Sequence, residues 1–231
     1  MNKAFIFDMD GVLVDSERAW NSDEIRLLRA MFGSAIADQI HETIVGTSLR
    51  DTYARARELG ATMPYEEFLR RYDEAVHAVY ARAHIADRLE PLGNKLIALG
   101  FKLGIVSSSP RSWIEKVLPY IPFRERLEAI ISITDTPELK GKPDPDGFLE
   151  AFKTLDADPK RSFVLEDSNV GIAAGKASGA FTIGYRGNLV EGYQQTGADV
   201  YADTMDEVAQ IVEVKMKISF TGKRECNKRR S

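Results

Sequence analysis

Acidic, hydroxyl and basic side chains follow several short apolar segments of this sequence. They are Asp8, Asp10 and Gly11 after residues 4–7, Ser107, Ser108 and Ser109 after 103–106, Lys142 beyond 129–133, and Glu166, Asp167 and Ser168 after 163–165. Any one of them alone is more typical of a strand end or a helix cap than of a functional site. If the apolar segments are parallel strands, however, the whole set meets at one edge of a sheet, which is where ligands bind in such folds.

Four carboxylates at one place repel one another unless a cation compensates them. A hard divalent ion with oxygen ligands resolves this conflict, and Mg²⁺ is the usual choice where a phosphate supplies further oxygens. Ser107 and the backbone N–H groups after it can donate to a phosphate, and Lys142 can neutralise both the phosphate and a nucleophilic carboxylate. This combination of residue types predicts a site for phosphoryl transfer, in which positioning and charge compensation dominate.

The elements that position these residues follow an alternating pattern. Apolar segments at 4–7, 103–106, 129–133, 163–165 and 181–183 alternate with helical patterns such as 145–155 and 169–178. Continuous apolar strands between helices predict an α/β fold, a doubly wound, Rossmann-like parallel sheet covered on both faces. Residues 16–88 show only helical periodicity, over 20–31, 34–44, 48–59 and 64–86, and predict an inserted helical cap.

We therefore expect a catalytic core made of residues 1–15 and 89–214, a cap of residues 16–88, and a basic, disordered tail of residues 215–231. The tail carries seven basic residues and one acid, whereas positions 1–214 carry 24 basic and 34 acidic residues. A segment with this excess of acidic residues is a poor binder of nucleic acid.

The composition excludes several other classes of protein. The chain has 231 residues, a formal charge of -4 and one cysteine, Cys226, so no internal disulfide or cysteine-cluster zinc site is possible. No apolar run approaches the roughly 20 residues of a membrane helix, and Asp8 and Asp10 interrupt the apolar N-terminal stretch. We expect a cytoplasmic enzyme, without a membrane or nucleic-acid partner, that acts as a monomer so that the cap can move.

Four sequence motifs, in order, resemble those of the haloacid dehalogenase-like superfamily. They are FIFDMDGVLVDSE at 5–17, GIVSSS at 104–109, GKPDPD at 141–146 and VLEDSNVGI at 164–172. The resemblance extends from residue 3 to about 212, and it is strongest to the branch of beta-phosphoglucomutases, phosphoglycolate phosphatases and sugar-phosphate phosphatases with a helical cap.

The resemblance implies a role for each motif residue. Asp8 is the nucleophile that forms an aspartyl-phosphate, and Asp10 is the general acid and base. Gly11 permits a tight turn beside the phosphate, Ser107 and Ser108 bind the phosphate, and Lys142 orients and neutralises it. The implied metal ligands are Asp8, Asp10, Glu166 and Asp167, with Mg²⁺ as the metal.

Hydrolysis and mutase chemistry share this aspartyl-phosphate, and the cap decides between them. Trp20 stands where beta-phosphoglucomutases carry a histidine, and Leu49 separates Ser48 from Arg50, unlike the mutase loop. Trp20 is either a substrate-stacking residue or an anchor between cap and core. Arg50, in the resembling specificity loop of residues 45–51, either binds a second acidic group of the substrate or pairs with a neighbouring carboxylate such as Asp51.

The sequence thus favours a Mg²⁺-dependent phosphatase for a small phosphorylated metabolite, a sugar phosphate or a phosphorylated organic acid. A beta-phosphoglucomutase-type mutase is the alternative. A binding module that has lost its activity is a more distant one, because none of the implied catalytic residues is missing.

Overall fold

The structure, a computed structural model, describes residues 1–41 and 47–228. Six strands form one parallel sheet in the order β3-β2-β1-β4-β5-β6. Their bounds are β1 (Ala4–Phe7), β2 (Lys102–Ser107), β3 (Leu127–Ser132), β4 (Phe163–Glu166), β5 (Phe181–Tyr185) and β6 (Val200–Ala202). Phe7 of β1 pairs with Ile105 on one side and with Leu165 on the other, so Asp8 leaves the sheet at the middle of its carboxyl edge.

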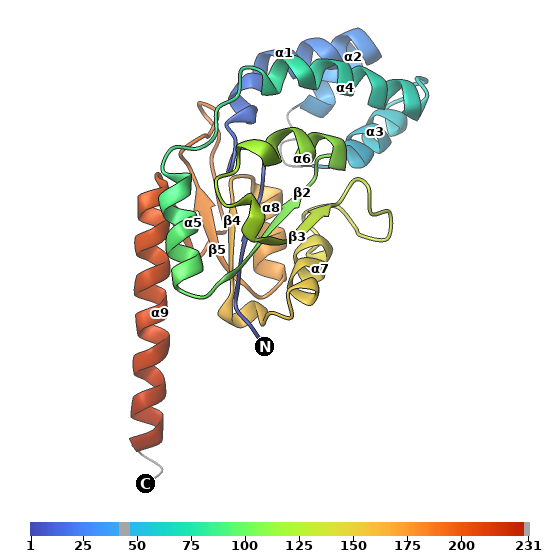
Figure 1. The fold of residues 1–231 in the computed structure, drawn as a ribbon. Coiled ribbons are helices and arrows are strands. Elements are labelled where there is room, and N and C mark those ends of the chain that lie inside the picture. Colours follow the sequence, from blue (N-terminus) through green and yellow to red (C-terminus); the bar gives the residue numbers. More distant parts are fainter. Residues whose placement is uncertain (42–46, 229–231) are drawn as a thin grey trace.

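Helices cover both faces of this sheet, which confirms the predicted doubly wound α/β fold (Figure 1). Phe5 and Phe7 of β1 point to the face covered by α5, α6 and α9, whereas Ala4 and Ile6 point to the face covered by α7 and α8. This alternation follows from the two-residue period of a strand. The bounds are α5 (Leu89–Ala98), α6 (Arg111–Val117), α7 (Asp146–Thr154), α8 (Asn169–Ala177) and α9 (Met205–Lys228), with short 3-10 helices η1 (Leu118–Tyr120), η2 (Arg124–Arg126) and η3 (Pro159–Arg161).

Four helices between β1 and α5 lie over the carboxyl edge of the sheet (Figure 1). They are α1 (Ser16–Phe32), α2 (Ser34–His41), α3 (Leu49–Glu58) and α4 (Tyr65–Tyr80). We call α1–α4 the cap, and the sheet with the helices that cover its two faces the body. The cap has a hydrophobic core of its own, which includes Phe68, Tyr72 and Val76 of α4, and Trp113 of α6 joins this core from the body. The domain boundaries given above stay a prediction.

The two chain segments that connect the cap to the body lie side by side. Val14 and Ile85 form an antiparallel bridge, Asp15 N donates to His84 O at 3.0 Å, and Ala86 N donates to Leu13 O at 3.0 Å. Because backbone hydrogen bonds tie the two connections together, a movement of the cap must bend both at once.

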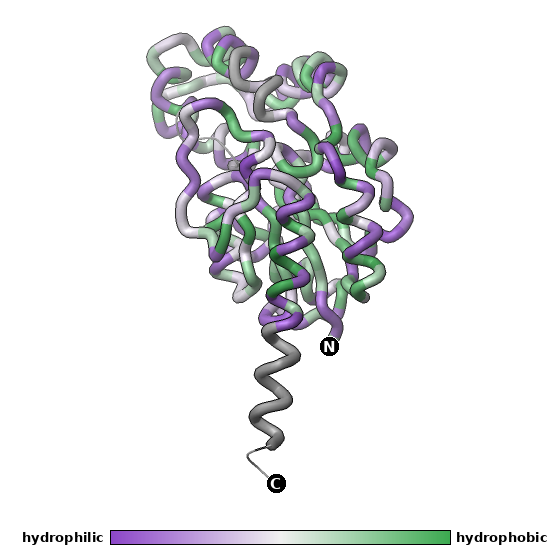
Figure 2. Tube along the Cα trace, turned by 90° about the vertical axis from the view of Figure 1, so that its left-hand side faces the viewer, coloured by the Kyte–Doolittle hydropathy of each residue, from purple (hydrophilic) through white to green (hydrophobic). Residues whose placement is uncertain are grey.

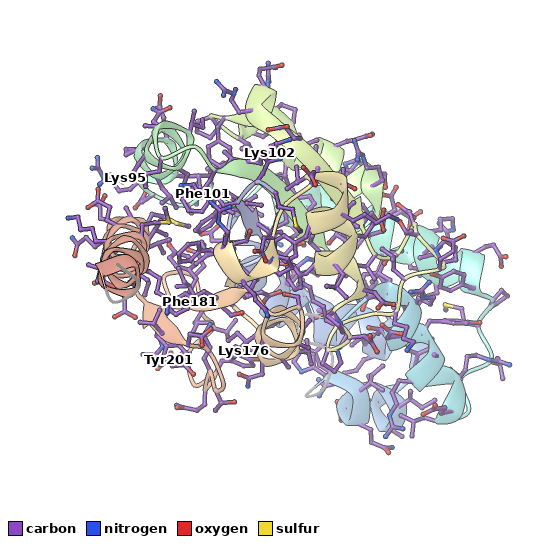
Figure 3. The ribbon with its side chains drawn as sticks, turned by 90° about the horizontal axis from the view of Figure 1, so that it is seen from below. Lys95, Phe101, Lys102, Lys176, Phe181 and Tyr201 are labelled. Atoms are coloured by element: carbon purple, nitrogen blue, oxygen red, sulfur yellow. The ribbon has the colours of Figure 1, made fainter. Side chains whose placement is uncertain are left out.

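The amino edge of the sheet, remote from the cap, is filled with aromatic rings. Phe101 and Phe181, labelled in Figure 3, both contact Phe163 edge to face, with ring centroids 5.6 and 5.5 Å apart. Phe5 also stacks on Phe163, at 6.0 Å. Aromatic pairs of this geometry stabilise a core beyond the area they bury. One edge of the sheet is therefore apolar and structural, while polar side chains gather at the other.

Several details differ from the sequence prediction. β6 was not predicted from the sequence. The fourth cap helix ends at Tyr80 rather than at residue 86, since the chain then turns into the connection with the body. The helix α9 continues to Lys228, so the predicted start of the tail at residue 215 falls inside a helix.

Hydrophobic and hydrophilic residues alternate along the helices, as expected for helices that cover a buried sheet (Figure 2). None of the helices in the described ranges, 1–41 and 47–228, is both long enough and apolar enough to span a membrane.

Candidate active site

A cavity of about 80 Å³ lies between the carboxyl edge of the sheet and the cap. The body contributes most of its polar wall and the cap most of its apolar wall. The lining residues of the body are Asp8, Asp10, Ser107, Ser108, Ser109, Trp113, Asp167 and Ser168, and those of the cap segment are Trp20, Glu24, Thr47, Leu49 and Tyr72. Residues 160 positions apart in the sequence thus share one small space.

Asp8, Lys142 and Glu166 form a buried ionic group beside this cavity. The Lys142 ammonium donates to Asp8 Oδ1 at 2.5 Å and also to Glu166 Oε1. All three residues are at most 5% exposed. Burial raises the pKa of Asp8 well above its ordinary value, Lys142 opposes this rise, and Glu166 adds to it. Burial also acts to lower the pKa of Lys142, but Asp8 and Glu166 outweigh it and raise that pKa, so the lysine remains charged.

Glu166 has all its contacts on the side of the body. Ser168 donates to Glu166 Oε2 through its backbone N at 2.9 Å and its hydroxyl at 3.0 Å, while Lys142 binds the other carboxylate oxygen. The Ser168 hydroxyl also caps α8 by accepting from Gly171 N at 3.1 Å. Glu166 is fully buried and does not line the cavity. In this arrangement it positions Lys142, which in turn holds Asp8.

Gly171 is what allows Glu166 to occupy this place, and its replacement gives a test. A Cβ atom on Gly171 would overlap the Glu166 carboxyl group. We expect Gly171→Ala to lower turnover at least about tenfold and to destabilise the fold by about 1–3 kcal/mol, as overpacking does. Steady-state kinetics and thermal unfolding check this, with Ala173→Ser, at an exposed position of the same helix, as the control. Unchanged turnover in Gly171→Ala would contradict the role given to Glu166.

Asp10 is held by three hydroxyl groups from three parts of the chain. Its Oδ1 accepts from Ser16 at 2.6 Å and from Tyr80 at 3.0 Å, and its Oδ2 accepts from Ser109 at 2.7 Å. Ser16 begins α1, Tyr80 ends α4, and Ser109 follows β2. The orientation of Asp10 therefore depends on the position of the cap relative to the body.

The segment after β2 supplies donors for an anion. Ser107 is buried and lines the cavity, and its hydroxyl oxygen accepts from Ser109 N at 3.0 Å, which curves the backbone around it. Thr134 donates to the carbonyl oxygen of Ser108 at 2.6 Å and fixes the turn from the neighbouring strand. Hydroxyl and amide donors presented in this way suit a phosphate group.

The carboxylates fit a hard divalent cation in part. Asp8, Asp10 and Asp167 line the same cavity, and this oxygen donor set suits Mg²⁺. Within the described part of the chain, no group of three or more acidic, histidine or cysteine side chains is already arranged to hold a metal ion. Asp8 and Asp167 would hold such an ion, and its positive charge would compensate these carboxylates and a bound phosphate.

The remaining predicted site residues lie in different places. Gly11 adopts a φ of 78°, which glycine tolerates best, in the turn that follows Asp10. Trp20 lines the cavity and stacks on Trp113 with ring centroids 5.9 Å apart. Arg50 donates to the Leu139 carbonyl at 2.8 Å and does not line the cavity. In the resembling specificity loop, Val45 and Gly46 lie outside the described residues.

The sequence interpretation gave no role to Glu24, Tyr72 and Tyr80, and it placed Ser109 at the edge of the sheet without naming a partner for it. Glu24 follows Trp20 by four residues in a predicted helix, so the two share a helix face. That spacing could have placed Glu24 beside Trp20, but nothing in the sequence says which face of the helix meets the cavity. Tyr80 contacts Asp10 only because α4 ends above β1.

The chain is similar to several known proteins. A family model described as haloacid dehalogenase-like hydrolase matches residues 5–185. The validoxylamine A 7'-phosphate phosphatase of Streptomyces hygroscopicus subsp. limoneus is 30% identical over 190 residues, which cover 80% of this chain and 85% of that protein. The beta-phosphoglucomutase of Bacillus subtilis (strain 168) is 27% identical over 226 residues, 91% of this chain and 93% of that protein.

The fold has counterparts among solved structures. That of a hydrolase from Pseudomonas syringae matches with a TM-score of 0.74 and 22% sequence identity, covering 92% of this chain and 99% of that one. The four motifs, the parallel sheet with its cap and the match over most of the chain agree, and the protein belongs to the haloacid dehalogenase-like hydrolase family.

Proposed function

We propose that this protein is a Mg²⁺-dependent phosphatase that hydrolyses a small phosphorylated metabolite through an aspartyl-phosphate on Asp8. The observation that carries the proposal is the buried group in which Lys142 binds one oxygen of Asp8, at the wall of a cavity that Asp10, Ser107 and Asp167 also line. The relative named as a phosphatase supports hydrolysis of a phosphate ester.

The first step breaks the ester bond. The Asp8 oxygen that Lys142 does not hold attacks phosphorus, and the bond from phosphorus to the ester oxygen breaks as the new bond forms. Asp10, in its protonated form, gives its proton to the departing oxygen. Ser107 and the N–H of Ser108 hold the phosphate oxygens during this step, and Lys142 balances their charge.

The second step frees the enzyme. Asp10, now a carboxylate, accepts a proton from a water molecule while the oxygen of this water attacks the phosphorus of the aspartyl-phosphate. The bond from phosphorus to Asp8 breaks, which releases inorganic phosphate and regenerates Asp8. Members of this family generally use a divalent metal ion. Bound by Asp8 and Asp167, Mg²⁺ would supply positive charge to the phosphate oxygens.

A mutase is the second candidate, since the relative named beta-phosphoglucomutase matches over most of both chains. In a mutase, a sugar hydroxyl rather than water reaches the aspartyl-phosphate. The position of Trp20 in the cavity wall, where the mutase resemblance would require a histidine, favours the phosphatase.

Release of inorganic phosphate from a panel of sugar and organic-acid monophosphates tests the proposal. We expect release with Mg²⁺ and loss of at least about 99% of it in excess EDTA, because the carboxylates cannot compensate the phosphate charge without the ion. Isomerisation of beta-glucose 1-phosphate primed by a bisphosphate, without phosphate release, would instead identify the mutase. Release that persists in EDTA would contradict the metal requirement.

A further inference from the structure

Glu24 of the cap lines the cavity but takes no part in the chemistry proposed above. Its Oε1 accepts a hydrogen bond from the Tyr72 hydroxyl at 3.0 Å. Tyr72 is 1% exposed and lies in the cap core, so it is a fixed support for the carboxyl group. Among the side chains that the structure describes, none donates a hydrogen bond to the second oxygen, Oε2.

The surroundings of Glu24 are aromatic. Trp20 contacts Tyr72, with ring centroids 5.7 Å apart, and stacks on Trp113 at 5.9 Å and an interplanar angle of 25°. The Trp113 indole N–H already donates to Asp73 at 3.2 Å, so this ring offers the cavity an apolar surface. Burial raises the pKa of Glu24 to about 7, against the Tyr72 hydrogen bond, which lowers it. Glu24 is half-buried, and its second carboxylate oxygen can accept a hydrogen bond from a donor group in the cavity.

The charges that line the cavity have one sign. Among the described residues that line it, those whose side chains can carry a charge near neutral pH are all carboxyl groups: Asp8, Asp10, Glu24 and Asp167. Asp8, Asp10 and Asp167 lie at the end of the cavity where the phosphate binds. Glu24 lies on the cap, where the leaving group of the substrate must lie. A second phosphate or a carboxylate placed there would face a like charge and an aromatic wall, which is unfavourable.

We propose that Glu24 is a specificity-determining residue that binds a hydroxyl or ammonium group on the leaving part of the substrate and discriminates against an anionic group there. The substrates would then be phosphate monoesters of neutral or amino polyols, with Trp20 and Trp113 in contact with their carbon face. The inference rests on the proposed phosphatase function and adds its substrate class.

Two matched substrate pairs test this class. Sorbitol 6-phosphate and 6-phosphogluconate differ only in a terminal hydroxymethyl or carboxylate group, and so do sn-glycerol 1-phosphate and 3-phospho-D-glycerate. At about pH 8, above the pKa of Glu24, we expect kcat/KM of the wild-type enzyme to favour the hydroxyl member of at least one pair by about tenfold or more. A preference for the carboxylate members would overturn the inference.

The variant Glu24→Gln keeps the shape of the side chain and removes its charge, and its amide can donate to a carboxylate. We expect it to reduce the preference to about threefold or less, mainly through KM. The hydroxyl substrate loses a favourable contact with the charged carboxylate, and the carboxylate substrate no longer meets a repulsion. Glucosamine 6-phosphate against glucose 6-phosphate separates an ammonium from a hydroxyl as the bound donor. Glu66→Gln, at an exposed position of α4, is the matched control and should leave every ratio unchanged.

Two further readouts separate the possible failures. The variant Tyr72→Phe leaves the carboxyl group in place but removes its support, and it should shift the same ratios in the same direction, even if Glu24→Gln fails to fold. p-Nitrophenyl phosphate carries no donor for Glu24, so in Glu24→Gln the ratio of kcat/KM for sorbitol 6-phosphate to kcat/KM for p-nitrophenyl phosphate should fall by about threefold or more. An equal loss on all substrates would overturn the specificity role alone. The absence of phosphate release by the wild type from any ester with Mg²⁺ would overturn the proposed function and this inference with it.

Discussion

The variant Asp8→Asn is expected to lose turnover by at least about 10⁴-fold, the order of loss seen when a covalent nucleophile is removed. An amide is a poor nucleophile and cannot form the aspartyl-phosphate. It also offers a cation a neutral oxygen in place of a charged one. Phosphate release under saturating Mg²⁺ measures the effect. Asp87→Asn, at an exposed position outside the cavity, is the control and should keep wild-type activity.

The same substitution should leave the fold intact, and this separates a chemical defect from a structural one. When both carboxyl groups are ionised, Asp8, Lys142 and Glu166 together carry one net negative charge in a buried place, and burial raises the pKa of Asp8. Asparagine removes this unfavourable charge, while Lys142 keeps Glu166 as its partner. Thermal unfolding in EDTA should therefore give a Tm that is equal to or above that of the wild type. An unfolded variant, or one that still releases phosphate at wild-type rates, would contradict the role of Asp8.

Much of the fold could be predicted because the relevant signals are local. The apolar segment before Asp8 and the segments before Ser107 and Glu166 are short, continuous and followed by polar residues, as buried parallel strands are. The parallel arrangement then brings their ends together without any knowledge of side-chain contacts. β6 escaped prediction because three residues, Val200–Ala202, add their pairing energy only when β5 is already in place.

Which partner each site residue contacts could not be predicted from the sequence. The sequence places Glu166 and Asp167 side by side, but successive side chains at the end of a strand point in different directions. One of them therefore binds Lys142 and Ser168, and the other lines the cavity. The location of Glu24 in the cavity wall could not be predicted for a related reason. The helical period shows which face of the helix carries this residue, but not what that face contacts. The contact of Arg50 with the Leu139 carbonyl likewise depends on how the cap sits on the body.

The variant Lys142→Met should show the largest loss of stability, and the loss should depend on pH. Methionine leaves Asp8 and Glu166 buried without a cation, and breaking a buried ion pair in this way costs about 3–5 kcal/mol. For a domain of this size, that is a fall of roughly 10 °C in Tm near neutral pH.

The sign of the pH dependence follows from Asp8. Burial raises the pKa of this carboxyl group and Lys142 opposes the rise. Without Lys142, the pKa of Asp8 in the folded state lies further above that in the unfolded chain, so the folded state binds more protons. The difference in stability between wild type and Lys142→Met should therefore be greatest at pH 7 to 8 and should shrink as the pH falls towards about 4, where the unfolded carboxyls also take up protons. Thermal unfolding in EDTA across this range measures it, with Lys140→Met, at an exposed lysine two residues earlier, as the control. A difference that does not change with pH would mean that lost packing around Lys142, rather than the charge it balances, destabilises the variant.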